Sequence, residues 1–330
     1  MSDQYLRKAS LTVGQASGSA IDLSSLRFSF SIRRGDIETP NSADVRVYNP
    51  APATVAALLA RGSSLEFTQI AIQAGYEGSF GLIFQGTIKQ VRYGRENQTD
   101  TYLDITAADG DSAYNYSTIA LSLAAGQTQP ANAVQAVIGN MAALKNGAVG
   151  TGYVPPNLGG NALPRGKVLY GMSKDEMRKI AVNSGCSWSI QDGQIVLVPL
   201  NGYLPGTVPV VNRMTGMIGL PEVTQNGITI KTLLNPNLKI GQAVKLDNAS
   251  VQQMRFGLSA SDVGANSLAT DFGARINRDG LYYVMQGNHT GDTRGQAWYT
   301  DLLCLAIDAS VPLDSNLSTT SFTGPVQRNG

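Results

Sequence analysis

The segment QGNHTGDTRGQAWYTD, residues 286–301, gathers the side chains best suited to chemistry. It holds the only histidine of the chain and three further functional side chains, namely His289, Asp292, Arg294 and Trp298. A histidine oriented by a carboxylate is the base of nucleophilic triads. A triad also needs a nucleophile, and GLSAS at 257–261 lacks the final glycine of a G-x-S-x-G elbow. The alternation on both sides of the turn predicts strand, turn and strand, with His289 in a structural role.

The turn within this segment places Asp292 and Arg294 close together. We expect these two side chains to pair with each other or to contact a neighbouring subunit.

Two other kinds of site have recognisable spacings that this sequence lacks. Zinc needs three or four ligands, and the chain offers one histidine and two distant cysteines, Cys186 and Cys304. GGNALPRGKV, residues 159–168, resembles a phosphate-binding loop. However, five residues rather than four separate its second and third glycines, and Val168 replaces the required serine or threonine. We therefore expect no metal, no cofactor and a solvated loop here.

Three carboxylates lie close together in DITAADGD, at Asp104, Asp109 and Asp111. A glycosidase needs two carboxylates facing each other across a cleft, and a calcium loop needs alternating ligands plus a distal glutamate. Neither pattern is complete. Asp109–Gly110 is better explained as a turn, with Asp111 or Ser112 capping the following segment.

The composition of the 330-residue chain indicates a folded protein with few surface charges. Hydrophobic residues make up 42% and charged residues 15%, against roughly 25% charged in an average soluble domain. We interpret this as a surface that partner subunits cover in large part. The net charge is +1 without a basic block, which argues against specific nucleic-acid binding.

The sequence gives no sign of export or membrane insertion. MSDQYLRKAS lacks the apolar stretch of a secretory signal, and no run approaches the roughly 18 apolar residues of a membrane span. Two cysteines do not make a disulfide framework, so we expect two buried thiols and folding in a reducing cytosol.

Alternating apolar and polar residues predict strands in the first hundred residues and again after residue 205. LRFSFSIRR is the clearest case, because every second residue from Leu26 to Ile32 is apolar. The predicted strands are 26–34, 43–49, 63–76 and 81–94, followed by TVPVVN, GITIKTLL, QAVKLDN, LYYVMQGNHT and AWYTDLLCLAID. Such short strands predict a closed or sandwiched antiparallel sheet, with one helix over 49–62.

The middle of the chain has a different character. Helical spacing predicts helices over 128–147 and 173–185, the second opened by a capping box of Ser173 and Glu176. Asp192–Gly193 predicts the turn of a following hairpin. The expected divisions are a first β unit over 1–108, an α+β module over 109–200, a second β unit over 201–310, and an arm over 311–330 that is flexible or ordered by a partner.

Four stretches resemble, in order, those of phage tail baseplate hub proteins. They are GDIETPNSADVRVYNP at 35–50, GCSWSIQDGQIVLVP at 185–199, the segment 215–247, and YVMQGNHTGDTRGQAWYTDLLC at 283–304. The positions that carry the resemblance in the last two stretches are Gly216, Gly219, Pro221, Gly227, Asn235, Pro236, Gly241, His289, Gly291, Asp292, Gly295 and Trp298. The segment 249–274 and the arm match nothing in that family.

Such hubs are similar to the trimeric hub of the T-even contractile tails. The resemblance implies a mainly β (β-rich α+β) fold with two tail-tube-like β-barrels and the α+β module between them. It implies a non-enzymatic homotrimer, a pseudo-hexameric ring that joins the six-fold tail tube to the three-fold central spike. Other baseplate subunits and the tape-measure protein are further implied partners, and the virion tail, assembled in the host cytoplasm, is the implied location.

Two alternatives stay open. One is a tail-associated cell-wall hydrolase using Asp104, Asp109 or Asp111 with His289. The other is a tail tube or sheath subunit, although tube proteins are usually shorter and consist of one barrel.

Overall fold

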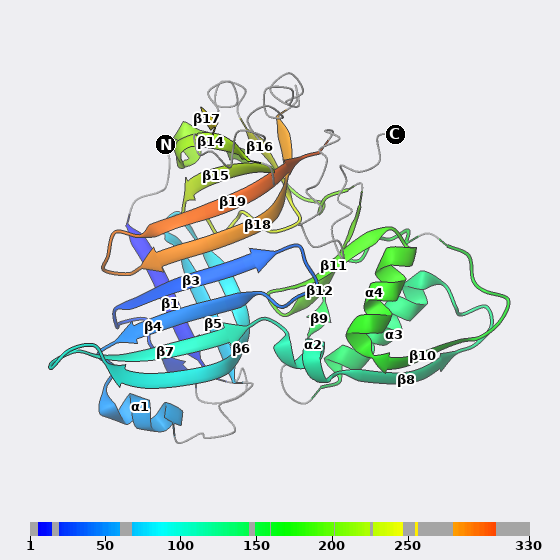
Figure 1. Ribbon diagram of the computed structural model, residues 1–330, viewed down its shortest axis with the longest axis horizontal. Coiled ribbons are helices and arrows are strands. Elements are labelled where there is room, and N and C mark those ends of the chain that lie inside the picture. The colour runs from blue at the N-terminus through cyan, green and yellow to red at the C-terminus, as the bar shows by residue number, and fades with distance from the viewer. Residues whose placement is uncertain are drawn as a thin grey trace.

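The computed structural model describes residues 6–14, 20–59, 68–144, 149–158, 160–200, 202–224, 227–246, 255–256 and 280–307. The predicted mainly β fold is confirmed, because strands dominate these residues. Figure 1 shows a broad sheet beside a smaller module that carries helices. No helix in these ranges is long and apolar enough to cross a membrane. Most of the segment 249–274 and the arm over 311–330 lie outside the described residues.

The first half of the sheet follows from strict alternation along its strands. In Phe28–Gly35 the side chains of Phe28, Phe30 and Ile32 are buried, and the serines between them are half-buried. The strands of this half are β1 (Arg7–Val13), β2 (Ile21–Asp22), β3 (Phe28–Gly35), β4 (Ser42–Tyr48), β5 (Gln69–Tyr76), β6 (Ser79–Arg95) and β7 (Thr101–Ala108). The helix predicted over 49–62 is α1 (Pro52–Leu59), which inserts Leu58 into the core of this half.

The second half of the sheet comes from residues after 209. Its elements are β13 (Val210–Val211), the 3₁₀ turn η2 (Arg213–Thr215), β14 (Met217–Thr224), β15 (Gly227–Leu233), β16 (Ala243–Leu246), β17 (Arg255–Phe256), β18 (Leu281–Asp292) and β19 (Trp298–Ala306). Alternate residues of β15 and β18 are buried in a second core with Ile230, Val284 and Leu302.

The two halves are joined by a direct strand pairing. β3 pairs antiparallel with β18, from Gln286 opposite Gly35 to Asp292 opposite Ser29. The main strand path is therefore β17-β14-β15-β19-β18-β3-β4-β7-β6-β5-β1-β2. Among the described strands this path is continuous from β17 to β2. Two separate barrels remain a prediction.

The module over 109–200 packs around its own core. Its elements are α2 (Asp111–Tyr116), β8 (Thr118–Leu123), α3 (Pro130–Ala142), β9 (Gly150–Thr151), β10 (Lys167–Met172), α4 (Ser173–Asn183), β11 (Cys186–Gln191) and β12 (Gln194–Pro199). α3 and α4 bury Val137, Ile138 and Met177 against Trp188 of β11. The predicted hairpin turn is present, with Asp192 at φ 53° and Gly193 at φ 76°.

Several local predictions were wrong. Ser173 does not cap α4, because its hydroxyl lies 2.7 Å from Ser117 Oγ and accepts from Asn140 Nδ2. Asp111 and Ser112 do not cap either, since α2 follows Gly110 without a side-chain cap bond. The expected loop is confirmed in its described residues up to Gly166, and only Lys167 and Val168 of the stretch 159–168 belong to a strand, β10. The two predicted buried thiols, Cys186 and Cys304, are confirmed.

Glycine is required at one point in the pairing of β18 with β3, where Gly291 lies opposite Phe30. A Cβ built on Gly291 would lie 2.3 Å from Phe30 Cζ, whereas a Cβ on Gly139 in α3 meets nothing within 4 Å. Gly291→Ala should therefore lower the free energy of unfolding by about 1–3 kcal/mol, because the buried ring must shift. Gly139→Ala should raise it by about 0.5–1 kcal/mol through helix propensity. Urea unfolding of both variants checks this, and a neutral Gly291→Ala would contradict the packing described.

Candidate functional site

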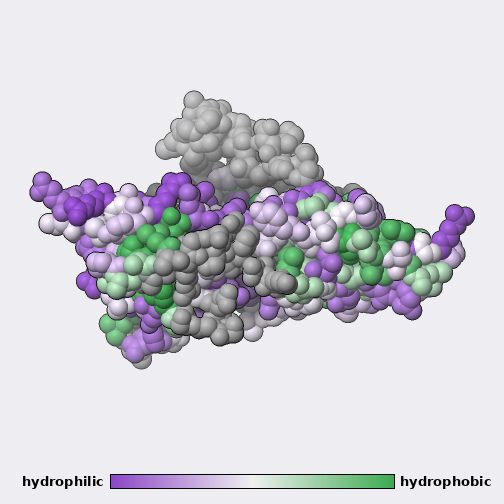
Figure 2. Space-filling view, turned by 90° about the horizontal axis from the view of Figure 1, so that it is seen from below, coloured by the Kyte–Doolittle hydropathy of each residue, from purple (hydrophilic) through white to green (hydrophobic). Residues whose placement is uncertain are grey.

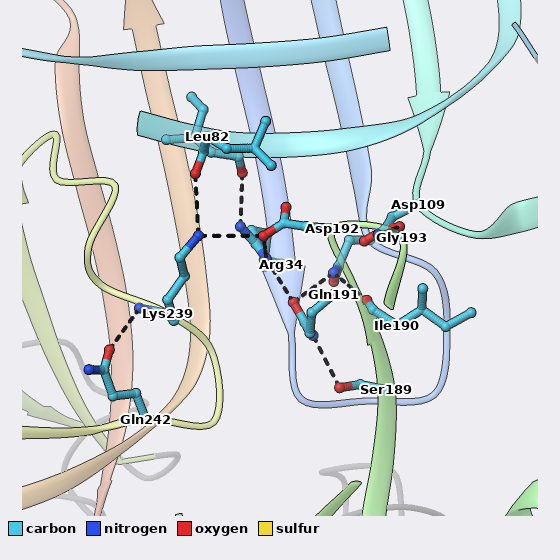
Figure 3. Close-up of polar contacts among 12 residues, drawn as sticks. Arg34, Leu82, Asp109, Ser189, Ile190, Gln191, Asp192, Gly193, Lys239 and Gln242 are labelled. Carbon is cyan, nitrogen blue, oxygen red and sulfur yellow. Dashed lines mark hydrogen bonds and ion pairs between the residues drawn. The ribbon is translucent and has the colours of Figure 1, made fainter. Parts of the chain in front are cut away.

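The most concentrated set of buried polar groups lies where the module meets both halves of the sheet. Its centre is Arg34, which is 4% exposed and occupies the next core-facing position of β3 after Ile32. Nη1 donates to the Ile83 carbonyl at 2.9 Å. Nη2 donates to Gln191 Oε1 at 3.1 Å and to Asp192 Oδ2 at 2.9 Å. Arg34 therefore ties β3 and β6 to the tip of the β11–β12 hairpin (Figure 3).

Asn41 and Gln191 extend this network on the first half's side. Asn41 Oδ1 accepts from Gly35 N at 3.0 Å, and its Nδ2 donates to the Ile190 carbonyl at 2.9 Å. Gln191 Nε2 donates to the Gly35 carbonyl at 2.9 Å and to Ser189 Oγ at 3.2 Å. The chain between β3 and β4 is thus fastened to the hairpin by directional hydrogen bonds.

The loop before β16 brings the second half to the same point. Lys239 Nζ lies 3.5 Å from Asp192 Oδ2 and donates to the Leu82 carbonyl at 3.3 Å (Figure 3). Asp192 therefore contacts two cationic side chains, Arg34 from the first half of the sheet and Lys239 from the second. We call Arg34, Asn41, Asp109, Gln191, Asp192 and Lys239 the polar junction.

A second carboxylate of the polar junction is almost completely buried. Asp109 is 1% exposed and accepts from Gly193 N at 2.7 Å. Burial, with a further contribution from the Asp192 charge, raises the pKa of Asp109 to about 7. Nearby, Asp36 accepts from the hydroxyls of Tyr283 and Ser187, and burial raises the pKa of that carboxyl as well.

His289 lies within the sheet and is almost completely buried. It is 2% exposed, and its Nδ1 shares a hydrogen bond of 2.9 Å with Thr300 Oγ1 on β19. Burial lowers the pKa of His289 to about 3, so the ring is neutral near pH 7. Thr300 Oγ1 also accepts from Asn235 N at 3.4 Å. His289 therefore links β18 through β19 to the start of the loop that carries Lys239.

The turn after β18 is ordered by Asp292. Its Oδ1 accepts from the backbone N–H groups of Arg294 and Gly295 at 2.9 and 2.8 Å. Arg294 was one expected ion-pair partner of Asp292. The ion pair is instead formed by Arg27, whose Nη2 lies 2.8 Å from Asp292 Oδ2. The hydrogen bond from Arg27 is the main cause that lowers the pKa of Asp292. Trp298 follows and packs edge-on against Phe30, with ring centroids 5.6 Å apart.

The other positions of the resemblance lie in β14, β15 and the turns of the second half. Gly216, Gly219, Gly227 and Gly241 have φ of 99°, 74°, 130° and 82°. At Gly227 a Cβ would come within 2.5 Å of the Cys304 carbonyl, so the close approach of β15 and β19 requires glycine. Pro221 lies in the irregular part of β14, where a missing N–H is tolerated.

Asn235 and Pro236 cross from the second half of the sheet to the first. Asn235 Oδ1 accepts from Asn237 N at 3.0 Å and shapes the loop. A Cβ on Gly81 would lie 3.3 Å from Pro236 Cβ. These residues therefore form a second contact between the halves, beside the pairing of β3 with β18.

The structure does not assemble the candidate hydrolase. Asp104 pairs bidentately with Arg46 at 2.7 and 2.9 Å, and Asp111 pairs with Lys89 at 3.0 Å. Asp109 is held by Gly193, and His289 by Thr300. In the part of the chain that the structure describes, none of the three carboxylates is hydrogen-bonded to His289.

A shallow cavity of about 540 Å³ lies on the outer face of the sheet. Side chains of β3, β4, β6, β7 and β18 line it, among them Arg46, Arg92 and Asp104. Arg46 pairs with Asp104 and Arg27 with Asp292, so opposite charges are matched across neighbouring strands. This face is polar, and its charges are largely matched across neighbouring strands.

The polar junction was not predicted from the sequence. The position of Arg34, its central residue, nevertheless indicates that this side chain is buried. Arg34 continues the buried series Phe28, Phe30 and Ile32. A charged residue at a core-facing position of a strand indicates a buried partner.

Arg34→Met should be strongly destabilising, because it leaves Asp192, whose side chain is 17% exposed, beside the buried Asp109 with only the more distant Lys239 as a cation. We expect a loss of about 3–5 kcal/mol in the free energy of unfolding. The control is the neighbouring Arg33, whose side chain is 70% exposed and lies 3.7 Å from Asp44. Arg33→Met should change stability by less than about 0.5 kcal/mol. Equal losses in urea unfolding would show that Arg34 does not hold the junction.

Asp109 should make stability depend on pH. A carboxyl whose folded-state pKa is about 7 instead of 3.8 stabilises the fold fully below pH 3.8, and that stability is lost as pH rises through 7. The difference corresponds to roughly 4 kcal/mol. Asp109→Asn keeps an oxygen for Gly193 N–H, so it should remove this part of the dependence and be more stable than the wild type at pH 8. Unfolding measured from pH 4 to 8 tests this, and identical pH profiles would refute it.

Comparison with known proteins agrees with this geometry. The family described as baseplate hub gp41 matches residues 9–252. No curated protein sequence matches the chain significantly.

The fold is similar to that of solved phage tail proteins. The tail protein from Neisseria meningitidis MC58 has 11% identity and a TM-score of 0.55, covering 91% of this chain and 96% of that one. The 43 kDa tail protein of prophage MuSo2 from Shewanella oneidensis has 9% identity and a TM-score of 0.56, covering 91% and 98%. The Francisella PdpA-VgrG complex contains a chain with 6% identity and a TM-score of 0.50, of which only 52% is covered.

At these identities the structural likeness shows the fold alone, whereas the family match extends over most of the sequence. The chain therefore belongs to the baseplate hub gp41 family.

Proposed function

We propose that this protein is a structural tail hub that assembles as a homotrimer and joins the six-fold tail tube to the three-fold central spike. A six-fold ring and a three-fold ring cannot share equivalent contacts one to one. A subunit that presents two similar units, one from each half of its sheet, resolves the mismatch, because three copies then present six units. In this proposal the two units are the predicted tube-like barrels over 1–108 and 201–310.

The observation that carries the proposal is the pairing of β3 with β18. It unites the halves through paired residues from Gly35 to Ser29. Lys239 of the polar junction, through the Leu82 carbonyl, and Pro236, through its contact with Gly81, add further contacts between them. Two units that are fixed to each other in this way keep a constant spacing, which a ring with two positions per subunit requires.

The proposed partners are the tail tube protein, the central spike protein, other baseplate subunits and the tape-measure protein. Obligate assemblies of this kind bury large, rather apolar interfaces. The 15% content of charged residues fits such burial, since unpaired charges are costly in an interface. The place of action is the virion tail, with assembly in the host cytoplasm.

The proposal predicts a trimer in solution. Size-exclusion chromatography with light scattering should give three times the chain mass of 34.9 kDa. Negative-stain images of the particle should show a ring with six similar lobes. The true symmetry of this ring should be three-fold, because each subunit contributes two lobes. A strictly monomeric protein at high concentration, or a true six-copy ring like that of a tube subunit, would refute it.

A further inference from the structure

The strand β11 separates the core of the module from the sheet. Trp188 and Ile190 point to one side of β11 and belong to the module's core. On the other side Ser187, Ser189 and Gln191 are at most 9% exposed, and Ser187 and Gln191 are hydrogen-bonded to Asp36 and to the Gly35 carbonyl of the sheet. Figures 1 and 2 show the module extending to one side of the sheet. The module therefore has a core of its own, and β11 meets the sheet through a buried polar layer.

The apolar part of the contact between the module and the sheet is small. From the module, Val196, Val198 and the half-buried Tyr153 pack in the cluster that contains Tyr283 of β18. Separating the module from the sheet exposes less apolar surface than disrupting either core, so it costs less free energy. The polar groups of the layer can exchange their hydrogen bonds for bonds to water. Such a boundary is suited to local opening with the cores intact.

The polar layer contains more buried carboxyl groups than cations to pair with them. Arg34 and Lys239 both pair with Asp192, at 2.9 and 3.5 Å. Asp36 and Asp109 are 2% and 1% exposed, and in the described part of the chain neither has an ion pair. A buried carboxyl without a cation is accommodated in its neutral, protonated form. Closing the contact therefore favours bound protons.

Asp109 stands where the chain passes from the sheet to the module. It follows the last residue of β7, and its own N–H donates to the Asn41 carbonyl at 2.9 Å. Its Oδ1 accepts from Gly193 N in the turn of the β11–β12 hairpin at 2.7 Å. Burial, followed by the charge of Asp192, raises the pKa of Asp109 to about 7, against a lowering effect of Arg34. The bond from Gly193 thus joins module and sheet through a carboxyl that binds a proton.

The other titratable groups around Asp109 act in the same direction or stay constant. Burial also raises the pKa of Asp36, which accepts from Tyr283 of β18. His289 of β18 has a pKa of about 3 because it is buried, so it stays neutral above pH 4.

Two ion pairs lie at the edges of the contact. Lys89 of β6 pairs with Asp111 of α2 at 3.0 Å, and Arg178 of α4 pairs with Glu38 at 2.7 Å. The lysine and arginine of these pairs are 48% and 39% exposed, so solvent screens both pairs.

We propose that the contact between the module and the sheet is a proton-controlled latch. The latch is closed while Asp109 carries its proton, and it loosens, with both cores intact, once Asp109 is ionised. Opening transfers Asp109 to water, where its pKa returns towards the ordinary value of 3.8. Opening therefore releases a proton between pH 3.8 and 7. Its equilibrium constant rises about tenfold per pH unit in this window and levels off above it, and Asp36 adds to the rise.

Labelling of a thiol placed in the polar layer measures this opening. Ser189→Cys introduces one at a position that is 1% exposed. Cys186 lies in the module's core and Cys304 in the second core of the sheet, so these native thiols report disruption of either core. The full-length protein is treated with iodoacetamide, and mass spectrometry gives the labelling rate at each position. Dividing by the rate of the unfolded chain at the same pH removes the titration of the thiol itself.

The introduced thiol should be labelled at least about tenfold faster than either native cysteine, because local opening is easier than unfolding of a core. Its normalised rate should rise at least about tenfold per pH unit between about pH 5 and 6.5. Asp109→Asn should reduce this rise by about tenfold per unit. Asp104→Asn, which removes a carboxylate paired with Arg46 on the outer face, should leave the rise unchanged.

Three results would overturn the latch. They are a normalised rate at position 189 that does not depend on pH, equal normalised rates at all three thiols, and the same rise in Asp109→Asn as in its parent. Circular dichroism establishes that each variant folds. If Asp109→Asn does not fold, the first two results remain decisive in the parent. Ser187→Cys, at a second buried position of the layer, takes the place of Ser189→Cys if that variant does not fold.

Discussion

The pairing of β3 with β18 is the constraint on which the rest of the structure depends. It connects a strand from the start of the chain with one from its end, so the two cores lie on one continuous sheet. The ladder fixes the register between the halves, since a shift by one residue would turn Phe30 and His289 to the wrong face. Gly291 is part of the same constraint. The ring of Phe30 occupies the position that a side chain at residue 291 would take, so the pairing requires glycine there.

The module is held to this sheet both by the polar junction and by an apolar cluster in which Val196 and Val198 of β12 pack with Tyr283 and Met285 of β18. Taking Arg34 and Asp192 out of water is costly, and Arg34 Nε and Asp192 Oδ1 are buried without a hydrogen-bond partner among the described residues. The hydrogen bonds of Arg34 Nη1, Arg34 Nη2 and Asp192 Oδ2 offset part of this cost. Such contacts have fixed directions and lengths, whereas apolar surfaces tolerate sliding. We regard the polar junction as the device that sets the orientation of the module relative to both halves.

Much of the fold could be predicted from local sequence. The strand β3 and the Asp192–Gly193 turn are each determined by a few neighbouring residues, so their patterns can be recognised in the sequence. Ser173 was misjudged because its hydroxyl is bonded to Ser117, far away in sequence. β8 and β10 were missed because each is short and acquires its pairing only from the other. Arg34 was missed because arginines usually lie on the surface. Its hydrogen-bond partner Gln191 is 157 residues away in the sequence, so no local pattern reveals the contact.

The long separation between β3 and β18 also governs how the chain can fold. While the ribosome is still making the module, β3 has β4 on one side and an open edge on the other. That edge is completed only when residues 281–292 emerge, so the joined sheet has a high contact order and closes late. An open edge of this kind can recruit the same edge of another nascent chain. Correct folding of the hub therefore requires that the chain is synthesised to its β18 segment. It also requires that unfinished chains rarely meet before that point.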